Sequence, residues 1–147
     1  MNTRRLRASL LALLFTALAM LNPLNAAAAD DAVVVIIHKD NQHAIDRNYL
    51  AAIYTGRLKG WPDGSPVFPL DQSDGASIRE TFYLRFVGRT VANMQAVWAQ
   101  NIFSGKGLPP KIASPDSEMK RIVSTNRNAI GYIRASEVDD TVRVLLR

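Results

Sequence analysis

Apolar and polar positions alternate along the chain in two patterns, one typical of strands and one typical of helices. Short runs rich in β-branched residues predict strands over residues 32–37, 67–70, 129–133 and 141–146. Longer segments with apolar residues every three or four positions predict helices over residues 46–56, 78–88, 90–102 and 114–123. The first strand run is apolar without interruption, which indicates that both faces of its sheet are covered.

Helix-start and helix-stop residues support these boundaries. We expect Asp46 to cap the first helix and Gly56 to end it in the left-handed conformation. Thr90 is expected to cap the third helix. Ser114 followed by Pro115 at the first helical position is expected to open the fourth.

The third helix carries a stripe of large apolar residues on one face, formed by Met94, Val97, Trp98 and Ile102. A stripe at this spacing is typical of a helix face that packs into a core. We therefore predict that these side chains are buried packing residues and not a ligand cage.

The order strand, helix, strand, three helices and two strands predicts an α/β fold with a mixed sheet flanked by helices. Residues 30–147 contain no internal repeat, linker or low-complexity segment. They are therefore predicted to form a single domain.

Residues 1–29 have the pattern of a cleaved signal peptide. Three arginines lie within the first seven residues, the stretch Leu10–Leu24 is apolar, and Ala27–Ala29 supplies the small residues of a cleavage site. The rival interpretation is a membrane anchor, but a spanning helix needs about 20 apolar residues, and a polar residue and a proline interrupt this run. The mature chain is expected to begin at Asp30 and to reside in the periplasm.

Composition narrows the function classes further. The formal net charge is +5, and the predicted signal peptide holds three arginines and no acid, so the mature chain carries only +2. Its cations are spread along the sequence, which argues against binding nucleic acid. There is no cysteine, so disulfides and thiolate metal sites are excluded.

The chain lacks the common local signatures of catalysis and metal binding. It contains no nucleophile elbow, HExxH motif, Walker-type glycine loop or paired carboxylates, so we expect no enzymatic activity. His38 and His43 are the only histidines, and a metal ion needs three or four converging ligands. No metal or cofactor is therefore expected, although a catalytic site assembled from distant residues stays an open alternative.

The loop that follows the second predicted strand is the strongest candidate site, because it leads directly into a helix. The first amides of a helix have no partner within it and attract anions. Gly75 would allow close backbone approach, Ser77 offers a hydroxyl, and Arg79 offers a cation suited to phosphate or carboxylate. Alternatively, Ser77 and Glu80 form a capping box that satisfies the helix start by themselves.

Several segments of the mature chain together resemble the phosphate-binding proteins of bacterial phosphate ABC importers, and more closely their short, exported, single-domain relatives. These segments are 50–57, 61–64, 73–75 and 129–133, with Arg79-x-x-Phe82-Tyr83, Trp98 and Phe103-x-Gly105-x-Gly107-x-x-Pro110. The resemblance implies one lobe of the type 2 periplasmic-binding-protein fold, and oxyanion contacts within residues 72–78.

The candidate loop departs from the pattern of that family, which has arginine, any residue, Asp-Gly, then serine, glycine and threonine. Only Asp74 and Gly75 carry over by position. The arginine position is Gln72, and the two hydroxyl positions are occupied by Ala76 and Ile78. Ser77 and Arg79 are candidates to replace the lost contacts, and Ser73, Asp74 and Gly75 complete the predicted set of ligand-binding residues.

The resemblance implies a non-catalytic domain that binds phosphate or a similar oxyanion and serves an ABC transporter or a sensor. The importer proteins enclose phosphate between two lobes, whereas this chain is long enough for one. A second copy or another protein would then close the half-site. The alternative is a periplasmic scaffold protein that kept the lobe and lost the anion.

Overall fold

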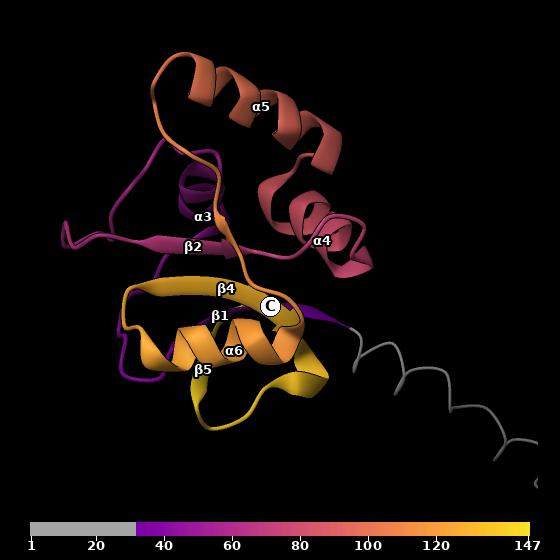
Figure 1. Ribbon diagram of the computed structural model, residues 1–147. Helices are drawn as coiled ribbons and strands as arrows, with labels where there is room; N and C mark the ends of the chain where they lie inside the picture. Colours follow the sequence, from indigo (N-terminus) through magenta and orange to yellow (C-terminus); the bar gives the residue numbers. More distant parts are fainter. Residues whose placement is uncertain (1–31) are drawn as a thin grey trace, which may run out of the picture.

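The computed structural model describes residues 32–147, so the expectations about the signal peptide lie outside the described residues. Five strands form one mixed sheet in the order β3–β2–β4–β1–β5 (Figure 1). The strands are β1 (Val33–His38), β2 (Phe68–Asp71), β3 (Lys111–Ile112), β4 (Ala129–Arg134) and β5 (Val142–Leu146). Strand β1 runs antiparallel to β4 and β5, whereas β2 runs parallel to β3 and β4.

Helices connect most of these strands. They are α3 (Arg47–Tyr54), α4 (Ser77–Phe82), η1 (Tyr83–Val87), α5 (Val91–Phe103), α6 (Asp116–Thr125) and η2 (Ala135–Glu137). Segment η1 is a π-helical turn that continues α4 directly, and η2 is a short 3₁₀ turn. The predicted α/β class and mixed sheet are confirmed.

The side chains of β1 divide the core into two halves, because successive residues of a strand point to opposite faces. Val33, Val35 and Ile37 pack with side chains of α3, α4 and η1. Val34 and Ile36 pack on the other face with side chains of α6. Helices therefore cover both faces of the sheet, as the uninterrupted apolar run predicted.

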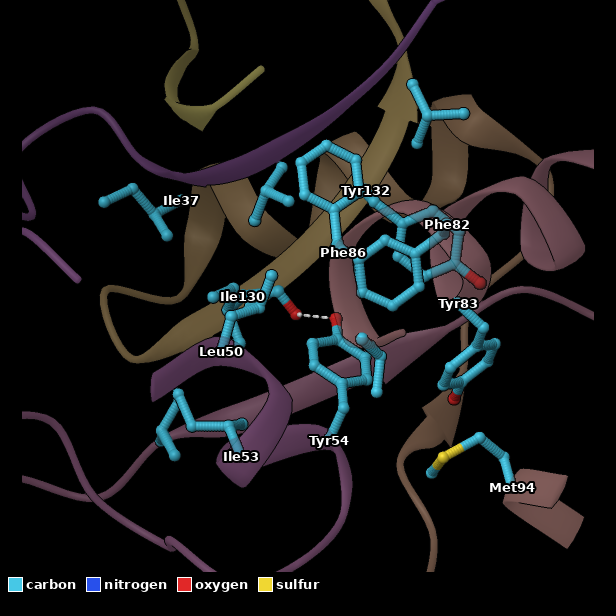
Figure 2. Close-up of a cluster of buried hydrophobic side chains, with 14 of the residues drawn as sticks. Ile37, Leu50, Ile53, Tyr54, Phe82, Tyr83, Phe86, Met94, Ile130 and Tyr132 are labelled. Atoms are coloured by element: carbon cyan, nitrogen blue, oxygen red, sulfur yellow. Dashed lines mark hydrogen bonds between the residues drawn. The ribbon is translucent and has the colours of Figure 1, made fainter. Parts of the chain in front are cut away.

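Aromatic side chains join α3, α4 and β4 within the first half of the core (Figure 2). The rings of Phe82 and Tyr132 are stacked with centroids 3.8 Å apart, and Tyr54 meets Phe82 edge-on at 4.7 Å. The hydroxyl of Tyr54 donates to the carbonyl of Leu70 at 2.9 Å and is 3.4 Å from that of Ile130. This buried hydroxyl thus ties α3 to the two parallel strands β2 and β4.

Three of the predicted helix boundaries are confirmed. The carboxylate of Asp46 accepts a hydrogen bond from the amide of Tyr49 at 2.8 Å, as an N-cap does. The hydroxyl of Thr90 caps α5 by accepting from the amide of Asn93. Gly56 follows α3 with a φ of 75°, the left-handed conformation expected there.

The predicted start of the fourth helix was wrong by one residue. Pro115 is the N-cap of α6, whose first helical residue is Asp116, and Ser114 lies outside the helix. The hydroxyl of Ser114 instead bonds to the loop after β2, 41 and 42 residues away in the sequence. Those distant partners outweigh the local capping preference.

Two further differences concern α5 and the strand after it. Ile102 is 51% exposed, so the prediction that it packs in the core was wrong, whereas Met94 is buried and Val97 and Trp98 are partly buried. The short strand β3 was not predicted. It consists of two exposed residues whose sequence lacks alternation, and it exists because β2 offers a parallel neighbour.

Candidate functional site

The loop after β2 forms one wall of a surface pocket of about 500 Å³. The start of α4, the start of α6 and the end of β4 form the other walls. The pocket is lined by Gln72, Ser73, Ala76, Ser77, Ile78, Ser114, Pro115, Asp116 and Arg134. Because β2 and β4 are parallel, their carboxyl ends bring these segments to one edge of the sheet.

The start of α4 presents backbone amides to this pocket. Ala76 is the N-cap and provides no side-chain bond, and the amide of Arg79 turns back to the carbonyl of Ala76 at 3.0 Å. Among residues 32–147, the amides of Ser77 and Ile78 have no hydrogen-bond partner. Unpaired amides at the positive end of a helix dipole favour an anion.

The capping box that the sequence allowed does not form. Ser77 is the first helical residue, and its carbonyl accepts from the hydroxyl of Thr81. The carboxylate of Glu80 faces the start of α5, where the amide of Val91 lies 3.4 Å from it. Neither Ser77 nor Glu80 therefore occupies the amides at the start of α4.

The floor of the pocket is a polar network centred on the buried side chain of Gln72. Its amide nitrogen donates to Asp116 Oδ1 at 2.9 Å, and its amide oxygen accepts a short hydrogen bond from the hydroxyl of Ser114. The backbone amide of Ser73 donates to the same hydroxyl at 2.8 Å. These bonds fix the loop to the segment that precedes α6.

Arg134 and Asp116 place opposite charges side by side in the pocket. The guanidinium of Arg134 lies 3.1 Å from Asp116 Oδ2, and the backbone amide of Arg134 donates to the same oxygen at 3.0 Å. The Arg134 side chain is 38% exposed, whereas that of Asp116 is 8% exposed. An anion entering the pocket would thus meet an accessible cation before the carboxylate behind it.

Asp71, the last residue of β2, is a buried carboxylate with four donors. Its Oδ1 accepts from the hydroxyl of Tyr132 and from the amide of Gln72 at 2.9 Å. Its Oδ2 accepts from the hydroxyl of Tyr83 at 2.8 Å and from Arg79 Nε at 3.0 Å. A carboxylate so fully satisfied holds the loop rigidly at the point where it leaves the sheet.

This environment shifts the acid–base behaviour of its partners. Burial first, and the Asp71 charge second, raise the pKa of Tyr83 and of Tyr132 above the ordinary value of 10.0. Burial works to lower the pKa of Arg79, but the charge of Asp71 and its hydrogen bond outweigh it, so the pKa is raised. Both tyrosines therefore stay neutral donors and Arg79 stays a cation at neutral pH.

The five residues predicted from the sequence divide into two groups. Ser73 and Ser77 line the pocket. Asp74 and Arg79 form an ion pair within the loop and helix start, and Gly75 makes the turn of the loop with a φ of 80°. The second group shapes the loop and does not line the pocket.

Sequence reasoning missed four side chains in and beneath the pocket: Asp71, Ser114, Asp116 and Arg134. Only Asp71 carried a local signal, as an acid at the end of an apolar strand run. The other three reach the pocket from segments 40 or more residues away.

The two histidines lie outside this pocket and have different partners. The His43 ring stacks on Trp61 at 4.9 Å and lies 3.5 Å from a carboxylate oxygen of Asp63, while His38 Nδ1 accepts from the amide of Asp40. Residues 32–147 contain no cluster of three or more acidic, histidine or cysteine side chains suited to a metal ion.

Within residues 32–147, no helix combines the length and apolar character of a membrane span.

Solved structures with the same fold include proteins described as acting in phosphate transport. One, described as a phosphate ABC transporter substrate-binding protein with bound phosphate from Clostridium perfringens, is 27% identical with a TM-score of 0.63. An ABC-type phosphate transport receptor from Vibrio cholerae is 18% identical with a TM-score of 0.61. PstS from Borrelia burgdorferi is 14% identical with a TM-score of 0.57.

These similarities extend over most of this chain and over less than half of each related chain. The matches cover 78%, 78% and 79% of this chain, but 44%, 45% and 47% of the proteins from C. perfringens, V. cholerae and B. burgdorferi. A search of curated proteins gives no match. A family model for the PBP superfamily domain matches residues 20–144, and the chain therefore belongs to that family.

Proposed function

We propose that this protein is an exported, non-catalytic ligand-binding domain that holds phosphate or a similar oxyanion in the pocket at the start of α4. One observation carries the proposal. The amides of Ser77 and Ile78 have no partner within residues 32–147, and both residues line the pocket. A helix start of this kind is an anion-binding element.

The surrounding side chains add the donors that an oxyanion needs. Ser73 and Ser77 contribute hydroxyl groups, and Arg134 contributes a guanidinium, whose forked donors match phosphate oxygens. Asp74, Gly75 and Arg79 contribute by holding the loop in its turn. Asp71 anchors the same loop from beneath.

The related structures support a binding role and the inference that this chain forms only part of the binding site. Their descriptions name substrate-binding and transport proteins for phosphate, so we infer binding rather than catalysis, and delivery to an ABC transporter. The signal-like pattern of residues 1–29 supports a periplasmic location. Because the chain spans under half of each related protein, we infer that a second copy or another protein completes the site.

A specific observation favours a second candidate function, that of a scaffold without a ligand. The carboxylate of Asp116 lies in the pocket wall, and the side chain of Gln72, at the position of the family's arginine, is tied to it. A negative charge at this position opposes anion binding. In that case the pocket edge would contact a protein.

Calorimetric titration with phosphate, sulfate and nitrate separates the two functions. Binding tighter than about 1 mM, worth about 4 kcal/mol, supports the receptor. No heat with any of the three anions supports the scaffold.

A pair of substitutions at Ser77 tests the helix start itself. Ser77→Ala removes the hydroxyl, and Ser77→Pro also removes the amide hydrogen. Proline is tolerated at the first helical position, and Ala76, with φ −68° and ψ 122°, has the backbone that precedes a proline. We expect Ser77→Pro to weaken phosphate binding at least about tenfold more than Ser77→Ala. Equal affinities of the two variants would remove the amide from the proposed site.

A further inference from the structure

A second surface, away from the start of α4, combines apolar pockets with a rim of lysines. One pocket of about 280 Å³ has Ile53 of α3 and Trp98 of α5 in its walls. The other, of about 360 Å³, is bounded by Phe68 of β2 and the last turns of α6. The two pockets share Leu108 and Pro69, so they form one continuous surface, which we term the lysine-rimmed face.

Large apolar side chains are exposed around this face. Leu108 is 79% exposed and Phe68 is 49% exposed, and both line the pockets. Next to the lining residues, Phe103 precedes the loop to Lys106 and is 95% exposed, and Ile112 of β3 is 51% exposed. A cluster of exposed apolar residues marks an interaction surface, whereas isolated ones are ordinary.

The charges on the face have one sign. Lys59 and Lys106 line the first pocket, Lys111 lines the second, and no aspartate or glutamate lines either. In the described part of the chain, none of the three ammonium groups forms an ion pair. The hydrogen bonds of Arg121, and in smaller part the charge of Lys111, lower the pKa of Glu118 on α6. Glu118 is thus close enough to Lys111 to sense its charge, but its carboxylate is already held by Arg121 through two bonds of 2.7 and 2.8 Å.

We propose that the lysine-rimmed face binds a segment of another polypeptide in which large apolar side chains are flanked by carboxylates. The apolar side chains would enter the two pockets, and the carboxylates would meet the three lysines. A second copy fits poorly through this face, because its lysines would meet the same lysines.

The location of the face leaves the anion pocket accessible. The anion pocket lies at the carboxyl ends of β2 and β4 and the start of α6, whereas Ile122 and Asn126 near the end of α6 line the lysine-rimmed face. Asp116, which lines the anion pocket, and Asn126, which lines the lysine-rimmed face, lie ten residues apart along α6, or about 15 Å. Partner and anion can therefore be bound at the same time, and this inference does not depend on the proposed anion site.

Fluorescence polarisation with two labelled peptides tests the proposal. One short peptide carries phenylalanine and leucine among glutamates, and the other carries the same apolar residues among lysines. We expect the purified protein to bind the acidic peptide and not the basic one, with affinity falling as salt rises. Equal binding of both peptides, or binding of neither, would overturn the proposal.

Matched variants locate the binding. Leu108→Asp and the double substitution Lys59→Glu with Lys106→Glu should each weaken binding of the acidic peptide at least about tenfold. The controls Leu84→Asp and Arg89→Glu alter an exposed leucine and an exposed cation outside both pockets, and should bind as the unaltered protein does. Loss of binding in the controls would contradict the assignment of the face.

Two further measurements test whether a second copy of the protein or a lipid surface binds this face instead. Sedimentation of the unaltered protein and of Leu108→Asp would reveal self-association through this face. Co-sedimentation with phosphatidylglycerol vesicles, compared with phosphatidylcholine vesicles, would reveal lipid binding. Either result, if abolished by Leu108→Asp while the acidic peptide fails to bind, replaces the polypeptide partner with that occupant.

Discussion

Arg79 Nε lies 3.0 Å from the buried Oδ2 of Asp71, and the same guanidinium also pairs with the exposed carboxylate of Asp74. The two carboxylates differ in environment, because the Asp71 side chain is 3% exposed and that of Asp74 is 84% exposed. The same arginine therefore forms one buried and one solvent-exposed ion pair, so the two pairs can be compared directly.

This arrangement predicts unequal costs for two similar substitutions. Asp71→Asn leaves Arg79 and two tyrosine hydroxyls with a poorer acceptor, so it should reduce the free energy of unfolding by roughly 3 kcal/mol or more. Asp74→Asn should cost below about 1 kcal/mol, because water screens that pair. Urea denaturation measures both. Equal losses would show that burial does not determine the strength of these pairs.

Buried tyrosines predict alkaline unfolding. Burial raises the pKa of Tyr54, Tyr83 and Tyr132 in the folded state above the ordinary 10.0. A group with a raised folded pKa contributes its full stability below the unfolded pKa and loses it as pH rises further. Stability should therefore fall above about pH 10. Three of the four tyrosines are in this group, so most of the tyrosinate absorbance should rise together with the loss of the circular dichroism signal, and a rise of most of it before unfolding would contradict the prediction.

If the pocket binds an anion, Asp116→Asn should strengthen that binding. The substitution removes a negative charge from the pocket wall and weakens the hold on the Arg134 guanidinium. We expect phosphate affinity to rise about tenfold at low salt. Glu118→Gln is the matched control, since it changes the net charge equally from an exposed position that pairs with Arg121. A similar gain in the control would assign the effect to net charge alone.

Close packing between β4 and α6 predicts a cost for a single added methyl group. A Cβ atom at Gly131 would collide with the sulfur of Met119, which is fully buried. Gly131→Ala should therefore reduce the free energy of unfolding by about 1–3 kcal/mol. Adding Met119→Val should recover part of this loss, because the two sites are in contact and their effects are not additive. Simple additivity in thermal unfolding would contradict the contact.

The sequence predicted the elements whose signals are local. The apolar run of β1, the cap at Asp46 and the left-handed Gly56 depend on neighbouring residues, and all three are confirmed. Ser114 was misassigned as a helix cap because its partners lie in the loop after β2. Pattern reasoning cannot detect a competitor that folding brings from 40 residues away.

The candidate site was also predictable only where its signals are local in the sequence. The loop and helix start were found because glycine, serine and arginine cluster within a few residues. The buried role of Asp71 was not, because its tyrosine partners lie 12 and 61 residues further along the chain. The open amides became evident only when Glu80 was found turned toward α5.

The pairing of β1 constrains when the protein can acquire its structure. Val35 pairs with Tyr132 on one side and with Leu146 on the other. Strand β1 can therefore pair only after segments about a hundred residues later in the chain have been synthesised. Contacts this distant in sequence form slowly and late. A nascent chain that lacks its last strands could therefore not complete this sheet, and if the protein is exported as we propose, this delay would keep it free of stable structure before transport.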